Sequence, residues 1–358
     1  CAMMCFFCIM AALLNTFLYP VLQKQKMTMP ESFWLLLSNS TKGDLKNMRL
    51  SDLKAGSNTK QTLLLPVASH YPIEMTVICG SCPGKTLVVT AGVHGCEYVG
   101  IETLNRLKKE LDPIDLSGRI ILLPLVNPEG FYMGSKQIIP ADGQNLNRTF
   151  PGDPEGTFSS RLAKLLEETL YPEADFLIDL HGGDVNEALT PLVFFPTAVS
   201  DALAAKASAA AASLSIPYRV ASTAKNGLYS WAAQCGIPAL LAERGERGLW
   251  CEDEVTACKR NIFELMAHLK IRPFSDTDLH QEEIRQAVYE EAPKNGFWYP
   301  AVSHAGQKLK KGTLLGTLKD IYGNEIFRCT APFDGVVLYY TLSLGVKCKD
   351  PLIAFGEI

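Results

Sequence analysis

Apolar residues gather in short, nearly uninterrupted runs from Thr62 onward, and polar segments separate these runs. Strands that are buried on both faces of a sheet have this pattern, because neither face presents polar residues to water. The predicted buried strands are Thr86–Val93, Arg119–Asn127, Asp175–His181 and Pro238–Glu243.

The segments between these runs repeat apolar residues every three or four positions, which is the period of a helix with one buried face. The predicted helices cover residues 101–111, 162–170, 201–214 and 255–269. Strands that alternate with helices predict an α/β fold, with a mainly parallel or mixed sheet flanked by helices.

The pattern changes after Pro273. Residues 276–295 are charged and are predicted to form a linker, whereas residues 296–358 contain short β runs separated by glycines. The segments AGQKLKKGTLLGTL and LGVKCKDPLIAFG place a glycine, two lysines and an apolar pair at similar offsets. Between them, Asp334-Gly335 is a hairpin signal. Two copies of one β unit predict a small C-terminal all-β domain, either a barrel or a sandwich.

The first 47 residues differ from the rest of the chain. They open with about twenty mostly apolar residues, which is enough to span a bilayer, although Asn15 and Pro20 interrupt the run. Two interpretations stay open: residues 1–25 are a membrane anchor, or residues 1–47 are a peripheral, non-native extension. The pattern of a folded domain begins near Met48, so residues 48–275 are the predicted catalytic domain.

Composition and charge narrow the class of protein. Hydrophobic residues make up 47% of the chain and charged residues 20%, as in a folded enzyme. The net charge is −4 without a long lysine or arginine run, so nucleic acid is not an expected partner. Eleven scattered cysteines favour reduced thiols in a cytoplasmic protein. Membrane association is expected only if residues 1–25 are an anchor.

Polar residues follow the predicted buried strands. His94 comes after the first run, His181 ends the third and Glu243 ends the fourth. In an open α/β sheet, ligands bind outside the carboxyl ends of the strands, so these side chains are expected at one edge. Glu97 follows His94 by three residues, which allows both side chains to turn to one side.

These residue types indicate metal chemistry. Two histidines and one carboxylate leave an open position on zinc, as in catalytic zinc sites. Zinc in such a site lowers the pKa of water towards roughly 7 and polarises a carbonyl. A further carboxylate has to carry a proton to the leaving nitrogen, and Glu243 is the candidate. The structural alternatives are a histidine that is only hydrogen-bonded, and a Glu243 that pairs with Arg244 or Arg247.

The segment DGQNLNRTFPG, residues 142–152, allows two interpretations. Glycine and proline are typical of an ordinary polar loop. Alternatively, the guanidinium of Arg148 and the amide of Asn147 grip a substrate carboxylate through several hydrogen bonds.

Taken in order, the motifs HGCE, NPEGF, DGQNLNRTFPG, DLHGG and AERG resemble the succinylglutamate desuccinylase and aspartoacylase family, a branch of the zinc carboxypeptidase-like fold. The resemblance covers roughly residues 80–260, and the C-terminal β domain is similar to that of predicted deacylases of this family. It implies that His94, Glu97 and His181 bind one Zn²⁺ per chain. It also implies that Glu243 is the general base and acid, and that Asn147 and Arg148 hold the substrate carboxylate.

Two positions depart from the family pattern. Cys96 stands where relatives commonly have Asp or Asn, and we expect its side chain to point away from the metal. Relatives often have an arginine before the Asn-Arg pair that polarises the carbonyl. Gln137 lies near that place, and Lys136 beside it is a candidate substitute.

The leading hypothesis is a zinc hydrolase that cleaves the amide bond of a small N-acyl amino acid or related carboxylate. The alternatives are a zinc carboxypeptidase that acts on peptides and a catalytically silent zinc-binding module. The expected partner is a small acylated substrate. The sequence is compatible with a homo-oligomer but does not determine the oligomeric state, and it identifies neither the acyl group nor the amine.

Overall fold

The computed structural model describes residues 50–65, 67, 71–275 and 280–358. The predicted anchor, residues 1–25, and the predicted extension, residues 1–47, lie outside these residues. In the described part of the chain, no helix is long and apolar enough to cross a membrane. Residues Leu50–Ile358 form one compact unit.

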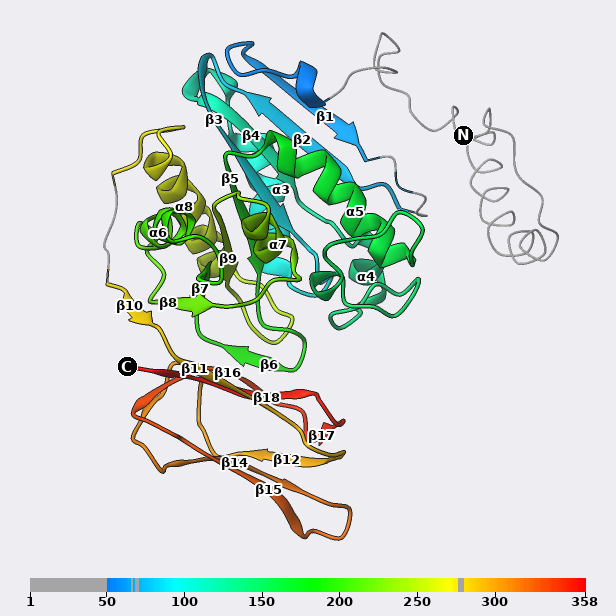
Figure 1. Cartoon of the computed structure of the whole chain (residues 1–358), viewed down its shortest axis with the longest axis vertical. Coiled ribbons are helices and arrows are strands. Elements are labelled where there is room, and N and C mark those ends of the chain that lie inside the picture. Colours follow the sequence, from blue (N-terminus) through cyan, green and yellow to red (C-terminus); the bar gives the residue numbers. More distant parts are fainter. Residues whose placement is uncertain (1–49, 66, 68–70, 276–279) are drawn as a thin grey trace, which may run out of the picture. The chain divides into compact units, whose positions relative to one another are not determined.

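A large mixed sheet forms the centre of this unit (Figure 1). Its strands in spatial order are β1 (Thr59–Leu64), β2 (Glu74–Cys79), β4 (Ser117–Leu123), β3 (Cys82–Ala91), β5 (Phe176–His181), β9 (Ala239–Glu243), β7 (Leu192–Pro196), β8 (Tyr218–Ser222) and β10 (Glu282–Ile284). Strands β4, β3, β5 and β9 are parallel to one another, whereas β2 and β7 run antiparallel to their neighbours β4 and β9. The predicted α/β fold is confirmed.

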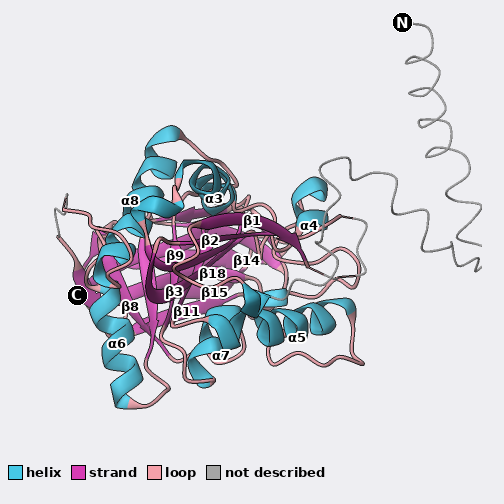
Figure 2. Cartoon of the chain, turned by 90° about the horizontal axis from the view of Figure 1, so that it is seen from above, coloured by secondary structure: helices cyan, strands magenta, loops and turns pink. Residues whose placement is uncertain are grey.

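Helices cover both faces of the large sheet (Figure 2). They are α3 (Tyr98–Glu110), α4 (Pro128–Met133), α5 (Phe158–Leu170), α6 (Asp201–Ala211), α7 (Leu228–Gln234) and α8 (Glu252–His268), with short 3-10 turns η5 (Leu50–Asp52), η6 (Pro113–Asp115), η7 (Leu146–Arg148) and η8 (Tyr171–Glu173). One hydrophobic cluster joins α3, α6 and α8 to the sheet, and a second joins α5 and α7.

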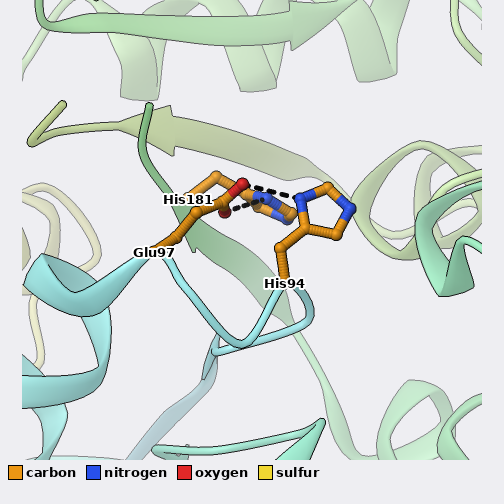
Figure 3. A group of neighbouring side chains, drawn as sticks. All are labelled: His94, Glu97 and His181. Atoms are coloured by element: carbon orange, nitrogen blue, oxygen red, sulfur yellow. Dashed lines mark hydrogen bonds and ion pairs between the residues drawn. The ribbon is translucent and has the colours of Figure 1, made fainter. Parts of the chain in front are cut away.

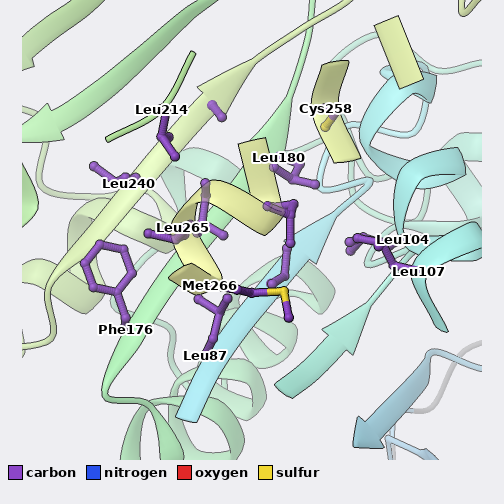
Figure 4. Packing of buried hydrophobic residues seen from close by; sticks show 14 of the residues in the cluster. Leu87, Leu104, Leu107, Phe176, Leu180, Leu214, Leu240, Cys258, Leu265 and Met266 are labelled. Atoms are coloured by element: carbon purple, nitrogen blue, oxygen red, sulfur yellow. The ribbon is translucent and has the colours of Figure 1, made fainter. Parts of the chain in front are cut away.

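The buried parts of the central strands are mostly apolar, because successive side chains of each strand pack alternately into one cluster and then the other. Leu87 and Val89 of β3 pack into the cluster of α3 and α8, whereas Val88 between them packs into the cluster of α5. Figure 4 shows Leu87 beside Met266 of α8, and Leu104 of α3 belongs to the same cluster. Burial of each such side chain contributes about 1.5–3 kcal/mol to folding, so the two clusters hold the ends of these strands firmly in place.

The C-terminal region consists of two antiparallel sheets (Figure 1). One contains β11 (Ala287–Glu291), β18 (Pro351–Glu357), β16 (Gly335–Thr341) and β13 (Lys308–Leu309), together with β6 (Glu187–Leu189); the other contains β15 (Glu325–Thr330), β14 (Leu314–Lys319), β12 (Gly296–Pro300) and β17 (Gly345–Val346). Trp298 and Phe355 are fully buried in the core of this region. The predicted small all-β region is confirmed.

The two similar sequence segments occupy equivalent places in these sheets. The first forms β13 and β14, and the second forms β17 and β18. β14 pairs with β12 and β18 with β16, while β13 pairs with β16 and β17 with β12. Each copy therefore contributes one strand to each of the two sheets, so the chain crosses between the sheets within each copy.

Two expectations about this region need correction. The expected linker, residues 276–295, contains β10, which extends the large sheet beside β8, and β11, which pairs with β18. The hairpin predicted at Asp334-Gly335 is wrong, because β15 pairs with β14 whereas β16 belongs to the other sheet. Asp334 instead accepts a hydrogen bond from the Lys311 N–H (2.9 Å) and pairs with Lys310 (2.7 Å), so it holds a neighbouring turn.

Candidate metal centre and active site

The turn after β3 presents His94 and Glu97. Gly92 has a φ of 67°, so the chain can turn directly after the strand. Gly95 lies so close to α4 that a Cβ there would be 2.2 Å from the backbone nitrogen of Phe131. The Glu97 N–H donates to the His94 carbonyl (3.3 Å), and α3 begins immediately after Glu97. Both side chains therefore leave the turn toward the same side.

His94, Glu97 and His181 meet in one buried cluster (Figure 3). The Nδ1 atom of His94 is 2.7 Å from Oε1 of Glu97, and Nδ1 of His181 is 2.8 Å from Oε2 of the same carboxylate. One ligand atom from each residue lies within 4.8 Å of the others. The structure thus brings together the three residues predicted to bind the metal.

The far side of each imidazole ring is held by an oxygen. Nε2 of His181 is 2.9 Å from Asp179 Oδ2, and the other oxygen of Asp179 accepts a hydrogen bond from the Thr90 hydroxyl (2.6 Å). Nε2 of His94 is 3.0 Å from the side-chain oxygen of Asn145. Because these oxygens accept hydrogen bonds, the ring protons belong on Nε2, which leaves both Nδ1 lone pairs for a metal.

Charge in the cluster suits a cation. Burial raises the pKa of Glu97, but His94 and His181 outweigh this effect and bring that pKa to about 2. Burial opposes the charged form of His181, yet the carboxylates of Asp179 and Glu97 raise its pKa well above the usual value. Two imidazole nitrogens and an ionised carboxylate form the donor set that zinc accepts with a position left open. The residues present therefore fit a metal ion.

Glu243, the predicted proton carrier, lies beside this cluster. It is the last residue of β9 and pairs in register with His181 of β5. Its Oε2 is buried and has no hydrogen-bond partner among the described residues. Burial raises the pKa of Glu243 well above its ordinary value; His181 opposes this shift, and nearby carboxylates such as Glu97 and Glu187 add to it. A carboxyl group with a raised pKa next to a metal cluster is suited to accept and return a proton.

The structural alternative for Glu243 is not observed in the described residues. Arg244 instead donates to Asn261 (2.7 Å) and Glu254 (3.1 Å). Arg247 pairs with Glu246 (3.2 Å). Both arginines that the sequence offers as partners are therefore occupied elsewhere.

The predicted carboxylate clamp, Asn147 and Arg148, forms the short turn η7. Asn147 is buried, and its side-chain oxygen accepts the Leu228 N–H (3.0 Å) at the start of α7, so Nδ2 is the donor left for a ligand. The side chain of Arg148 is exposed, although its Nη1 donates to the Asn147 carbonyl (2.8 Å). Both Arg148 and Glu243 lie within electrostatic range of Tyr229 in α7.

Cys96 is not among the residues of the metal cluster and is hydrogen-bonded to a different carboxylate. Its thiol donates to Oδ1 of Asp184 (3.1 Å), and burial together with that carboxylate raises the pKa of Cys96 to about 12. Asp184 Oδ1 also accepts the Val185 N–H (2.6 Å). Cys96 therefore ties the turn after β3 to the turn after β5.

Lys136, the candidate substitute for a family arginine, is half-buried near these carboxylates. It lies within electrostatic range of Asp184 and Glu187. Gln137 adopts a left-handed backbone conformation, with φ of 53°. The position of Lys136 is compatible with a role at the site, and that role stays a prediction.

Several residues that contact the cluster or lie near it are absent from the sequence predictions. Asp179 could have been found from the sequence, because a carboxylate inside an otherwise apolar, buried strand requires a hydrogen-bonding partner. Asn145 lies in the same motif as Asn147 and had no separate signal. Glu187 and Tyr339 come from strands β6 and β16, which are distant in sequence, and only their pairing in the folded chain brings them together.

The fold and the site define an α/β protein with a candidate metal centre at the edge of its sheet. Residues 83–269, more than half of the chain, match the succinylglutamate desuccinylase/aspartoacylase catalytic domain. The chain belongs to this family, as its motifs predicted.

Solved structures agree with this assignment. The chain is 27% identical to a succinylglutamate desuccinylase/aspartoacylase from Rhodobacter sphaeroides, with a TM-score of 0.74 and coverage of 83% of this chain and 95% of that chain. The product-bound ectoine utilization protein EutE from Ruegeria pomeroyi has the same fold, with 24% identity, a TM-score of 0.73 and coverage of 84% and 95%.

One relative of known activity matches over a shorter segment. The chain is 41% identical over 100 residues to the N-alpha-acetyl-L-2,4-diaminobutyric acid deacetylase of Halomonas elongata. This match spans 28% of the present chain and 29% of that relative.

Proposed function

We propose that this protein is a zinc-dependent deacylase that hydrolyses the amide bond of a small N-acyl amino acid or related carboxylate. The observation that carries the proposal is the buried His94–Glu97–His181 cluster beside Glu243, in a chain of the desuccinylase and aspartoacylase family. The deacetylase named above and the structural relatives support amide hydrolysis as the reaction.

Each residue of the site has a separate role in the proposed reaction. His94, Glu97 and His181 would hold the zinc ion, which supplies Lewis acidity toward the attacking water and the substrate carbonyl. Asp179 and Asn145 keep the ring protons on Nε2, which leaves the Nδ1 lone pairs of His94 and His181 to bind the ion. Glu243 takes the proton from the attacking water and returns it to the leaving nitrogen.

The substrate carboxylate binds at the turn η7. Arg148 offers a guanidinium with parallel donors, and Asn147 offers its Nδ2. This arrangement orients the scissile carbonyl relative to Glu243, and such orientation itself lowers the barrier.

The test is a metal-supplemented activity screen that compares N-acyl amino acids, including Nα-acetyl-L-2,4-diaminobutyric acid, with short peptides. We expect hydrolysis of N-acyl amino acids, stoichiometric zinc by elemental analysis, and little hydrolysis of peptides. Peptide hydrolysis alone would identify a carboxypeptidase. A purified protein without zinc and without activity would identify a silent binding module.

A further inference from the structure

Glu187 lies between the two loops that follow the site strands. Its N–H donates to the Asp184 carbonyl (2.9 Å) in the loop after β5, which carries His181. Its carbonyl accepts the Arg247 N–H (2.8 Å) in the loop after β9, which carries Glu243. The backbone at Glu187 is therefore fixed relative to both residues of the active site.

Among the described residues, the carboxylate of Glu187 has no neutralising partner. It is half-buried, and only its burial and longer-range charges act on it, without a side-chain hydrogen bond. Lys136 lies within electrostatic range but not at ion-pair distance. Burial and the carboxylates of Glu97 and Asp184 raise the pKa of Glu187 to about 8. A bound cation would reverse this shift by stabilising the ionised form.

Strand pairing sets tyrosine rings on the same side as Glu187. In the β6–β16 pair, Glu187 is opposite Thr341 and Leu189 is opposite Tyr339, so Glu187 and Tyr339 occupy one face as diagonal neighbours. Ala354 of β18 pairs with both Tyr339 and Tyr289, which places the second tyrosine in the same row. The ring centroids of Tyr289 and Tyr339 are 6.3 Å apart.

We infer that Glu187 selects substrates whose side chain carries a free ammonium group, which binds between the Glu187 carboxylate and the ring of Tyr339. The inference rests on the proposed deacylase function and narrows its substrates to N-acylated diamino acids. A carboxylate supplies the opposite charge and hydrogen-bond acceptors, and an aromatic face adds a favourable interaction with a cation. Glu187 is a specificity residue rather than a catalytic one, because the proton transfer belongs to Glu243.

The test compares two substrates that differ in a single group. Nα-acetyl-L-2,4-diaminobutyric acid ends in an ammonium, and N-acetyl-L-norvaline has a methyl group in its place. We expect the zinc-loaded enzyme to favour the diamino substrate by roughly 10- to 100-fold in kcat/KM, the range for a charged hydrogen bond. Glu187→Gln should reduce this ratio about tenfold or more. The control Glu291→Gln, at an exposed position on β11, should retain the ratio and the activity.

Binding of the free amino acids, measured by calorimetry, separates this inference from the proposed function. Tighter binding of 2,4-diaminobutyric acid than of norvaline, lost in Glu187→Gln, would support the role of Glu187 even if no amide were hydrolysed. Equal binding of the two, or equal hydrolysis of their acetyl derivatives by the unmodified enzyme, would overturn it and leave the deacylase proposal standing.

Discussion

At the scale of single residues, the two nitrogens of His181 have different neighbours. Nδ1 faces Glu97 and Nε2 faces Asp179, so a proton on Nε2 satisfies Asp179 while Nδ1 turns to the metal position. Glu243 beside this ring has a buried oxygen without a partner among the described residues. Such an atom is costly in a structural role and useful in a catalytic one.

The first prediction concerns Glu243→Gln. The amide keeps the size of the side chain and removes its ability to carry a proton, so kcat should fall by about 10²- to 10⁴-fold. Zinc content, measured by elemental analysis, should stay near one ion per chain. Glu291→Gln is the control: it makes the same chemical change at an exposed position and should leave kcat unchanged. Retained activity, or loss of the metal, in Glu243→Gln would contradict the assignment.

The second prediction concerns Asp179→Asn. This change removes the charge that orients His181, so the affinity for zinc should fall about 10- to 100-fold, as measured by competition with a chromophoric chelator. Asp175→Asn makes the same chemical change just before β5, where the carboxylate accepts the Thr86 N–H (2.8 Å). That control should leave the zinc affinity unchanged. An equal loss in both variants would mean that strand stability, and not ring orientation, is responsible.

At the scale of elements, the parallel strands β3, β5 and β9 end at the same edge of the sheet and are followed there by tight turns. The turn after β3 depends on the close contact of Gly95 with α4. Helix α4 starts with Asn127 at its N-cap, where the side chain accepts the Gly130 N–H (2.9 Å). The motif NPEGF thus has a structural role, because it forms the start of α4, and the turn that carries His94 and Glu97 packs against this helix.

The third prediction concerns Gly95→Ala. The added Cβ would overlap backbone atoms of α4, which cannot rotate away, so stability should fall by about 1–3 kcal/mol or more. The displaced turn should also weaken zinc binding. Gly345→Ala on β17 is the control, because no atom lies within 4 Å of the place that its new Cβ would occupy. Thermal unfolding and zinc titration of both variants test this; an unchanged Gly95→Ala protein would contradict the packing argument.

At the scale of the whole described unit, the C-terminal sheets have a core of their own and also pair with β6, which follows the His181 loop. β6 follows the His181 loop and pairs with β16, and β10 extends the large sheet beside β8. A small cluster that includes Leu192, Val220 and Leu338 packs between the two regions. Tyr339 is therefore held next to the loops that carry the chemistry.

The fourth prediction concerns zinc and global stability. An ion that binds only the folded chain stabilises it by about 4 kcal/mol at a free concentration a thousandfold above the dissociation constant. Thermal unfolding should therefore shift upward with zinc and return after chelation. The double variant His94→Ala/His181→Ala should show no such shift. A zinc-dependent shift that survives in this variant would place the metal elsewhere.

Much of the α/β fold could be predicted from sequence, because strands buried on both faces of a sheet are mostly apolar. Runs such as Asp175–His181 carry that signal by themselves, and the observed strand β5 agrees with it to within one residue. Edge strands were harder to predict. β1 alternates between half-buried and exposed positions, and β10 has only three residues, so neither differs clearly from a polar loop.

The polar residues at the strand ends can be read from local sequence, because His94 and Glu97 follow an apolar run, and His181 and Glu243 end such runs. The folded chain adds the groups that contact them, such as Asp179 beside His181. Glu187 and Tyr339 carry no local signal, and they meet through the pairing of β6 with a strand far along the chain. Local composition encodes burial, whereas contacts between distant strands depend on the packing of the entire fold.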